Sequence, residues 1–167
     1  MSSESEEGQA TQRVTIRRAT RDDLPAVLAC LAAAFEPYRA RYTPEAFQDT
    51  VLTRPRAEKR LDEMTILVAE RDGLILGTIA YRVIGDGTGH LRGMAVLPDF
   101  HGQGLADKLL QAAESALRAA GCSCVTLNTT HPLERAVRFY AKQGYEPTGA
   151  KKDYFGMPLI ERAKRLA

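Results

Sequence analysis

A glycine-containing turn at residues 101–106 is the part of the sequence best suited to bind a charged ligand. Glycine lets a backbone approach a ligand closely. The first turn of a helix also presents N–H groups without helical partners and the positive end of the helix dipole. A phosphate or pyrophosphate fits such a position. The turn comes between an apolar strand and a helical segment, and its residues are His101, Gly102, Gln103, Gly104, Leu105 and Ala106.

Two common phosphate-binding motifs do not fit this turn. The Walker pattern Gly-x-x-x-x-Gly-Lys-Ser/Thr is absent from the sequence. A dinucleotide fingerprint beginning at Gly102 would need glycine or alanine where Asp107 stands, and an acid about 20 residues later, where 122–128 has none. A tight turn without a ligand explains the same residues equally well, so spacing alone leaves both interpretations open.

Hydrophobic periodicity predicts the elements that hold this turn in place. A strand is predicted over 90–97, and a helix from near residue 102 to Gly121, which is typical of a C-terminal cap. A further strand near 125–127 leads into a helix that opens at Thr130-His131-Pro132 and ends at Gly144. The apolar stripe of that second helix comprises Leu133, Ala136, Val137 and Tyr140.

The remaining pattern predicts an α+β fold with a mixed, mostly antiparallel central sheet flanked by helices. Upstream we expect a strand at 14–17, one helix from Thr20 and a second from Thr43, then a hairpin at Asp72-Gly73. Two short strands, near 145–148 and 157–160, close the chain. We expect a disordered polar tail over residues 1–12 and a single domain over 13–167.

Composition excludes several classes of protein. The 23 basic and 21 acidic side chains nearly balance, which argues against a nucleic-acid partner or a membrane surface. No apolar run reaches the roughly 18 residues of a membrane span, and no signal pattern opens the chain, so a cytoplasmic location is expected. The three cysteines lack disulfide or metal-site spacing, and no metal is expected.

Two motifs resemble the GNAT superfamily of N-acetyltransferases. His101–Ala106 resembles its Gln/Arg-x-x-Gly-x-Gly/Ala motif, with His101 at the Gln/Arg position and Gly104 and Ala106 matching. About 35 residues later, Ala136–Tyr145 resembles its Ala-x-x-x-Tyr-x-x-x-Gly-Phe/Tyr signature, although Leu133 stands where the family often has asparagine. The resemblance covers roughly residues 14–166.

The resemblance implies acetyl-CoA as co-substrate. In the family, backbone amides of the 101–106 motif hold the pyrophosphate, and the preceding strand pairs with the pantetheine arm and helps to hold the thioester. The residues that this carries over are His101, Gly102, Gln103, Gly104, Leu105 and Ala106 for the pyrophosphate, and Met94, Ala95 and Val96 for the arm.

Acetyl transfer to an amine needs a base for the amine and an acid for the departing thiolate. Tyr140 is the candidate acid, because a phenol stays protonated at neutral pH. Its place on an apolar stripe also fits an ordinary core tyrosine, and the family motif favours the acid. His90 is the candidate base, since some family members carry glutamate there and imidazole titrates near neutrality. An exposed histidine at a strand edge without a catalytic task is the alternative.

The family resemblance therefore implies an acetyl-CoA-dependent N-acetyltransferase that acts by direct attack of a primary amine, borne by a small molecule or a peptide; spacing alone gives only an anion-binding α+β domain. A non-catalytic acyl-CoA-binding or regulatory module is the alternative function. Tyr38, Arg41, Tyr42 and Tyr81 are candidates to line the acceptor site, and Lys108, Arg138 and Lys142 to reach the 3′-phosphate of CoA. The family resemblance admits a homodimer without requiring one.

Overall fold

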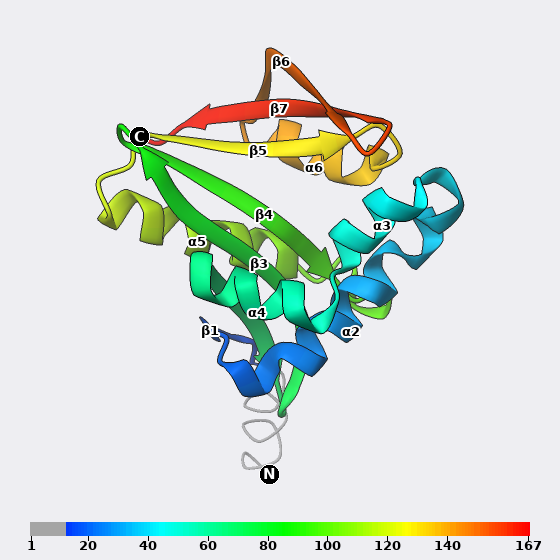
Figure 1. The fold of residues 1–167 in the computed structure, drawn as a ribbon. Coiled ribbons are helices and arrows are strands. Elements are labelled where there is room, and N and C mark those ends of the chain that lie inside the picture. Colours follow the sequence, from blue (N-terminus) through cyan, green and yellow to red (C-terminus); the bar gives the residue numbers. More distant parts are fainter. Residues whose placement is uncertain (1–12) are drawn as a thin grey trace.

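The computed structural model describes residues 13–167, and the predicted disordered tail at 1–12 lies outside this range. Figure 1 shows a twisted sheet crossed by helices on both faces. The sheet has seven strands in the order β1-β2-β3-β4-β5-β7-β6, and every neighbouring pair is antiparallel except β4 and β5. The strands are β1 (Thr15–Arg18), β2 (Thr65–Arg71), β3 (Leu74–Gly85), β4 (Thr88–Val96), β5 (Cys124–Thr130), β6 (Glu146–Tyr154) and β7 (Met157–Arg165). The predicted α+β fold is confirmed.

Helices cover the two faces of the sheet with separate apolar cores. One face packs against α2 and α4 through a cluster that includes Leu31 and Ala57, and the other packs against α5 through Leu109 and Leu117. Tyr140 of α6 belongs to the same cluster as Leu109 and Leu117. The helices are α2 (Leu24–Phe35), α3 (Pro44–Val51), α4 (Arg54–Glu63), α5 (Leu105–Ala119) and α6 (Glu134–Lys142), with short 3₁₀ turns at Arg21–Asp23, Glu36–Arg41 and Pro98–Phe100.

The single helix predicted from Thr43 is in fact two helices. Thr43 caps α3 as expected, because its hydroxyl accepts a hydrogen bond from the Ala46 N–H at 3.3 Å. Leu52 then leaves the helical region with a φ of +64° and ends α3. Pro55 starts α4 in its first turn, where no intrahelical donor is required. The break lets α4 dock separately onto the sheet.

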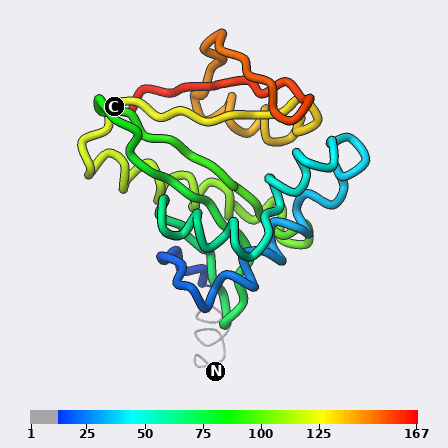
Figure 2. Tube along the Cα trace, in the orientation of Figure 1, coloured from blue at the N-terminus to red at the C-terminus, as the bar shows by residue number. Residues whose placement is uncertain are grey.

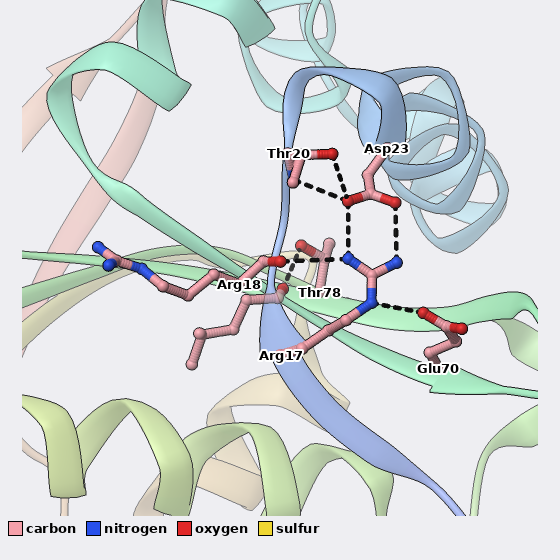
Figure 3. Close-up of polar contacts among 7 residues, drawn as sticks. Arg17, Arg18, Thr20, Asp23, Glu70 and Thr78 are labelled. Atoms are coloured by element: carbon pink, nitrogen blue, oxygen red, sulfur yellow. Dashed lines mark hydrogen bonds and ion pairs between the residues drawn. The ribbon is translucent and has the colours of Figure 1, made fainter.

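Arg17 of β1 forms ion pairs with Asp23, at the start of α2, and with Glu70 of β2. Arg17 donates to both carboxylate oxygens of Asp23, at 2.8 and 2.9 Å, and also to Glu70 (Figure 3). Asp23 in turn accepts from the Thr20 N–H at 2.7 Å. The hydrogen bonds from Arg17 hold the pKa of Asp23 well below its usual range, so this carboxylate is ionised whenever the protein is folded near neutrality.

The two parallel strands β4 and β5 separate after their first three residues. They pair only where Thr88, Gly89 and His90 face Cys124–Thr126. Beyond this point β4 stays paired with β3, and β5 stays paired with β7. Figure 2 shows the two traces together near the C-terminus and diverging toward α3. The divergence leaves the inner edge of β4 without a neighbouring strand, and this is where the candidate site lies.

Candidate active site

A cavity of about 580 Å³ occupies the gap between the diverging strands. Its walls come from β4, β5, α6, the turn before α5, and the α2–α4 region. Of the residues predicted to be catalytic or to bind the cofactor, Gln103 does not line this cavity. Those that do are His90, Met94, Ala95, Val96, His101, Gly102, Gly104, Leu105, Ala106 and Tyr140.

The turn before α5 has an open backbone. Gly102 and Gly104 both have a φ of +78°, in the left-handed region that side chains rarely adopt. A Cβ atom added at either residue would meet no protein atom within 4 Å. The two glycines therefore face free space and not a packed neighbour.

The N–H groups of this turn have no protein acceptor in the described part of the chain. The first helical bond of α5 runs from Lys108 N–H to Gly104 O at 3.1 Å, and no side chain caps the helix. No hydrogen bond from the backbone N–H groups of residues 102–107 is found within 13–167. These donors, together with the helix dipole, fit a phosphate or pyrophosphate group.

The side chains of His101 and Gln103 point to different places. His101 Nε2 lies 3.1 Å from Val96 O and must donate to that carbonyl, so the imidazole folds back over the end of β4. Gln103 Oε1 instead accepts from Arg71 on the β2–β3 hairpin, at 3.3 Å. The Oε1 atom of Gln103 is thereby directed to Arg71.

Tyr140 reaches the cavity from the buried face of α6. Its side chain is 7% exposed and packs edge-on against Phe139 and Tyr145, with ring centroids 5.3 and 5.7 Å away. Its hydroxyl has no hydrogen-bond partner among residues 13–167. Burial raises the pKa of Tyr140, which keeps the phenol protonated at neutral pH. A protonated hydroxyl that lines a cavity can donate a proton there.

His90 stands at the point where β4 and β5 part. Its Nδ1 lies 2.8 Å from Thr126 Oγ1, and Thr126 Oγ1 donates in turn to Gly89 O at 3.4 Å. With its own proton directed to Gly89, Thr126 accepts the Nδ1 proton, and the lone pair of His90 is on Nε2. Burial lowers the pKa of His90, and Arg82 and Arg92 lower it further, so the ring is neutral at pH 7.

The region between α2 and α3 contributes aromatic side chains to the wall of the cavity. Tyr38 and Tyr42 line the cavity, and the Tyr42 hydroxyl lies 2.6 Å from Thr130 Oγ1 at the end of β5. Arg41 does not line it and pairs with Glu134 at 3.7 Å.

The basic residues proposed for the 3′-phosphate of CoA, and Tyr81, lie outside the cavity wall. Lys108, Arg138, Lys142 and Tyr81 are absent from the walls of this cavity. Arg135, in the first turn of α6, lines it instead.

A polar cluster in the wall of the cavity was not predicted from the sequence. Asp49 of α3 accepts from Arg92 Nη2 at 2.6 Å and from the Tyr154 hydroxyl at 2.5 Å. Arg60 of α4 is 8% exposed and also lines the cavity. A signal for Arg60 existed, since it follows the apolar Ala57 by three residues and so shares its buried face. The charged composition of α4 hid that signal.

The fold thus combines a parallel strand pair that diverges with a glycine turn beside the gap. Residues 28–145 match the family model described as the Acetyltransferase (GNAT) family, and the chain belongs to this family.

Solved structures of acetyltransferases share the fold. The PaiA N-acetyltransferase of Thermoplasma acidophilum, in complex with coenzyme A, superposes with a TM-score of 0.77 at 20% identity, over 93% of this chain and 100% of that one. The ribosomal-protein-alanine N-acetyltransferase of Brucella melitensis superposes with a TM-score of 0.70 at 24% identity, over 91% and 99% of the two chains.

The curated relatives are longer proteins. An amino-acid acetyltransferase of Azotobacter vinelandii is 32% identical over 101 residues, which is 60% of this chain and 22% of that protein. One of Pseudomonas syringae pv. syringae is 30% identical over 111 residues, or 66% and 25% of the two chains. The match thus spans about a quarter of these relatives.

Two further features are absent from residues 13–167. No helix in this range is both long enough and apolar enough to cross a membrane. Within the same range, no group of three or more His, Cys, Asp or Glu residues is arranged to hold a metal ion.

Proposed function

We propose that this chain transfers an acetyl group from acetyl-CoA to a primary amine by direct attack. The observation that carries the proposal is the set of unpartnered N–H groups at 102–107, opening onto the same cavity as Tyr140 and His90. The turn would bind the pyrophosphate of acetyl-CoA. The free inner edge of β4 at Met94–Val96 would pair with the pantetheine arm, as the parallel strand β5 does at residues 88–90.

Two side chains supply the proton transfers. His90 Nε2 takes a proton from the attacking amine, whose nitrogen forms the new bond to the carbonyl carbon. Backbone N–H groups of the free β4 edge stabilise the negative charge that develops on the carbonyl oxygen. As the carbon–sulfur bond breaks, the Tyr140 hydroxyl gives its proton to the thiolate. The neutral His90 and protonated Tyr140 at pH 7 are the forms that these roles need.

A covalent route through cysteine is less well supported. Cys30 and Cys122 are buried, and burial raises the pKa of the Cys30 thiol to about 12. A thiol with so high a pKa is a poor nucleophile at neutral pH.

A thermal melt tests the co-substrate site. Acetyl-CoA at about 100 times its dissociation constant adds roughly 2.7 kcal/mol to the free energy of unfolding, or roughly 5–10 °C for a domain of this size. We expect this rise with acetyl-CoA and none with NAD. The alternative function, a non-catalytic acyl-CoA-binding module, predicts the same melt but no amine-dependent release of CoA. No shift at millimolar acetyl-CoA would contradict both. The cytoplasmic location and the homodimer stay predictions from the sequence.

A further inference from the structure

Arg60 places a positive charge inside the acceptor half of the cavity. The side chain comes from the buried face of α4 and is 8% exposed. In the described chain, its guanidinium has no ion pair within 4.0 Å and donates no hydrogen bond. A guanidinium that is mostly withdrawn from water and has no ion pair is costly. No Arg60 nitrogen is among the fully buried unpartnered atoms of the described residues, so the group remains open to the cavity. An anion that enters the cavity would supply that partner.

Positive charges outnumber negative ones around Arg60. Asp49 is the carboxylate whose charge acts on Arg60, and it already binds Arg92 at 2.6 Å and Arg56 at 3.5 Å. Across residues 13–167, no other carboxylate lies within 4.0 Å of any of these three arginines. The cluster therefore has one negative charge for three positive ones. A polyamine would be repelled here, and a carboxylate would be attracted.

Arg60 stays charged in spite of its neighbours. Burial lowers its pKa to about 10, Arg92 acts in the same direction, and Asp49 opposes them. At neutral pH the guanidinium is therefore still protonated. A planar guanidinium can bind a carboxylate through two parallel hydrogen bonds.

The guanidinium also lies beside the strand that would hold the thioester. Gly93 sits in the bulge of β4 with a φ of +65°, directly before Met94. A Cβ atom added at Gly93 would come within 2.7 Å of Arg60 Nη1. Because Gly93 has no side chain, the Arg60 guanidinium can lie against the backbone of β4. A carboxylate bound there would lie close to the reacting centre, as it would if carboxylate and amine belonged to one small molecule.

We propose that the acceptor is a small amine that carries a carboxylate, with the chemistry of a free amino acid, and that Arg60 binds this carboxylate. The inference rests on the proposed function and names its substrate class. It excludes polyamines, and it excludes peptide N-termini without a nearby carboxylate.

Matched substrate pairs test this recognition. Free amino acids and their primary amides share amine and side chain but differ in the carboxylate. We would measure kcat/KM with acetyl-CoA for both members, and also the rise in Tm that each causes in the presence of CoA. The wild type would be compared with Arg60→Gln. Arg56→Gln is the control, because Arg56 binds the same Asp49 from outside the cavity.

At least one free acid should exceed its amide by about 10- to 100-fold in kcat/KM, the usual size of a lost charge-assisted hydrogen bond. Arg60→Gln should bring this ratio close to one, and Arg56→Gln should leave it unchanged. Equal use of acid and amide by the wild type would overturn the inference, as would an acid preference that survives in Arg60→Gln. So would turnover confined to amines without a carboxylate, although the proposed function would stand.

The binding measurement separates the two claims. If no amine is acetylated, the proposed function fails. The thermal melt still tests whether Arg60 recognises carboxylates. If it does, free acids raise the Tm of the wild type more than their amides do. In Arg60→Gln the two should raise the Tm equally. Equal shifts for both members of every pair, or no shift for either, would contradict the inference.

Discussion

His90 Nδ1 and Thr126 Oγ1 lie 2.8 Å apart across the last paired residues of β4 and β5. Immediately beyond this contact the strands diverge and the cavity begins. The hydrogen bond fixes the ring at the junction and leaves the Nε2 lone pair free. The contact at the end of the strand pair thus also orients the imidazole of His90, the candidate base.

His90→Gln should lower kcat by about 10²- to 10⁴-fold if His90 is the general base. Thr126→Val removes the acceptor of the Nδ1 proton and should cause a smaller loss, because the imidazole remains but its tautomer is no longer fixed. Both effects are measured by steady-state kinetics with saturating acetyl-CoA. An unchanged kcat in His90→Gln would leave His90 as a strand-edge residue without a catalytic task.

The pH dependence carries an independent signature of His90. A base must be deprotonated to act, and burial lowers the pKa of this ring below its usual value of about 6.5. Referred to the concentration of unprotonated amine, kcat/KM should therefore stay level as the pH falls from 7.5 to about 6.5, and decline only below that point. A decline that begins well above pH 7 would show that a different base limits the reaction.

Tyr140→Phe tests the general acid. The hydroxyl lacks a hydrogen-bond partner in the described protein, so its removal should change the Tm by little, while kcat falls by about 10²- to 10⁴-fold. An acetyl thioester of an acidic aryl thiol should reduce this defect, since its thiolate leaves without a proton. Full activity with acetyl-CoA in Tyr140→Phe would favour the ordinary core tyrosine.

Gly104→Ala tests the anion-binding turn. A left-handed alanine costs about 1–2 kcal/mol in stability, and the shifted N–H groups should weaken acetyl-CoA binding as well. Gly73→Ala is the matched control, because Gly73 has nearly the same φ, +79°, and equally open surroundings in the β2–β3 hairpin. Titration calorimetry should give a raised Kd for Gly104→Ala alone. Equal Kd values in both variants would mean that the turn does not hold the co-substrate.

Asp23→Asn tests the tie between β1 and α2. The folded pKa of Asp23 lies below its unfolded value of about 3.9, so its ion pair stabilises the fold above that pH and is lost as the pH falls through the folded pKa. At pH 7 the variant should melt about 2–6 °C lower than the wild type. The difference should shrink steadily below pH 4. A constant difference from pH 7 to pH 2 would contradict the ionic origin.

Local signals account for the parts of the structure that were predictable. Asp72 and Gly73 have φ values of +53° and +79°, as the predicted hairpin turn requires. The periodicity of α5 and the glycines before it likewise depend on neighbours in sequence. The break between α3 and α4 was missed because Leu52, an ordinary helix former, leaves the helix there.

Long-range packing accounts for the parts that were not predictable. Arg60 is buried because α4 packs against α2 and β2. Its guanidinium reaches the bulge of β4, more than 30 residues away, where Gly93 gives it space. No feature of the α4 segment alone reveals that contact. The partner of His90 was hidden for the same reason, since Thr126 meets it only through the parallel pairing of β4 with β5.

Amine-dependent cleavage of acetyl-CoA tests the proposed function most directly. The protein is incubated with acetyl-CoA and a panel of free amino acids, amino-acid amides, polyamines and peptides, and mass spectrometry counts CoA and acetylated amine. We predict one acetylated amine for each CoA released, with at least one acceptor. Binding of acetyl-CoA with no amine-dependent release of CoA across the panel would contradict the account and favour a non-catalytic acyl-CoA-binding module.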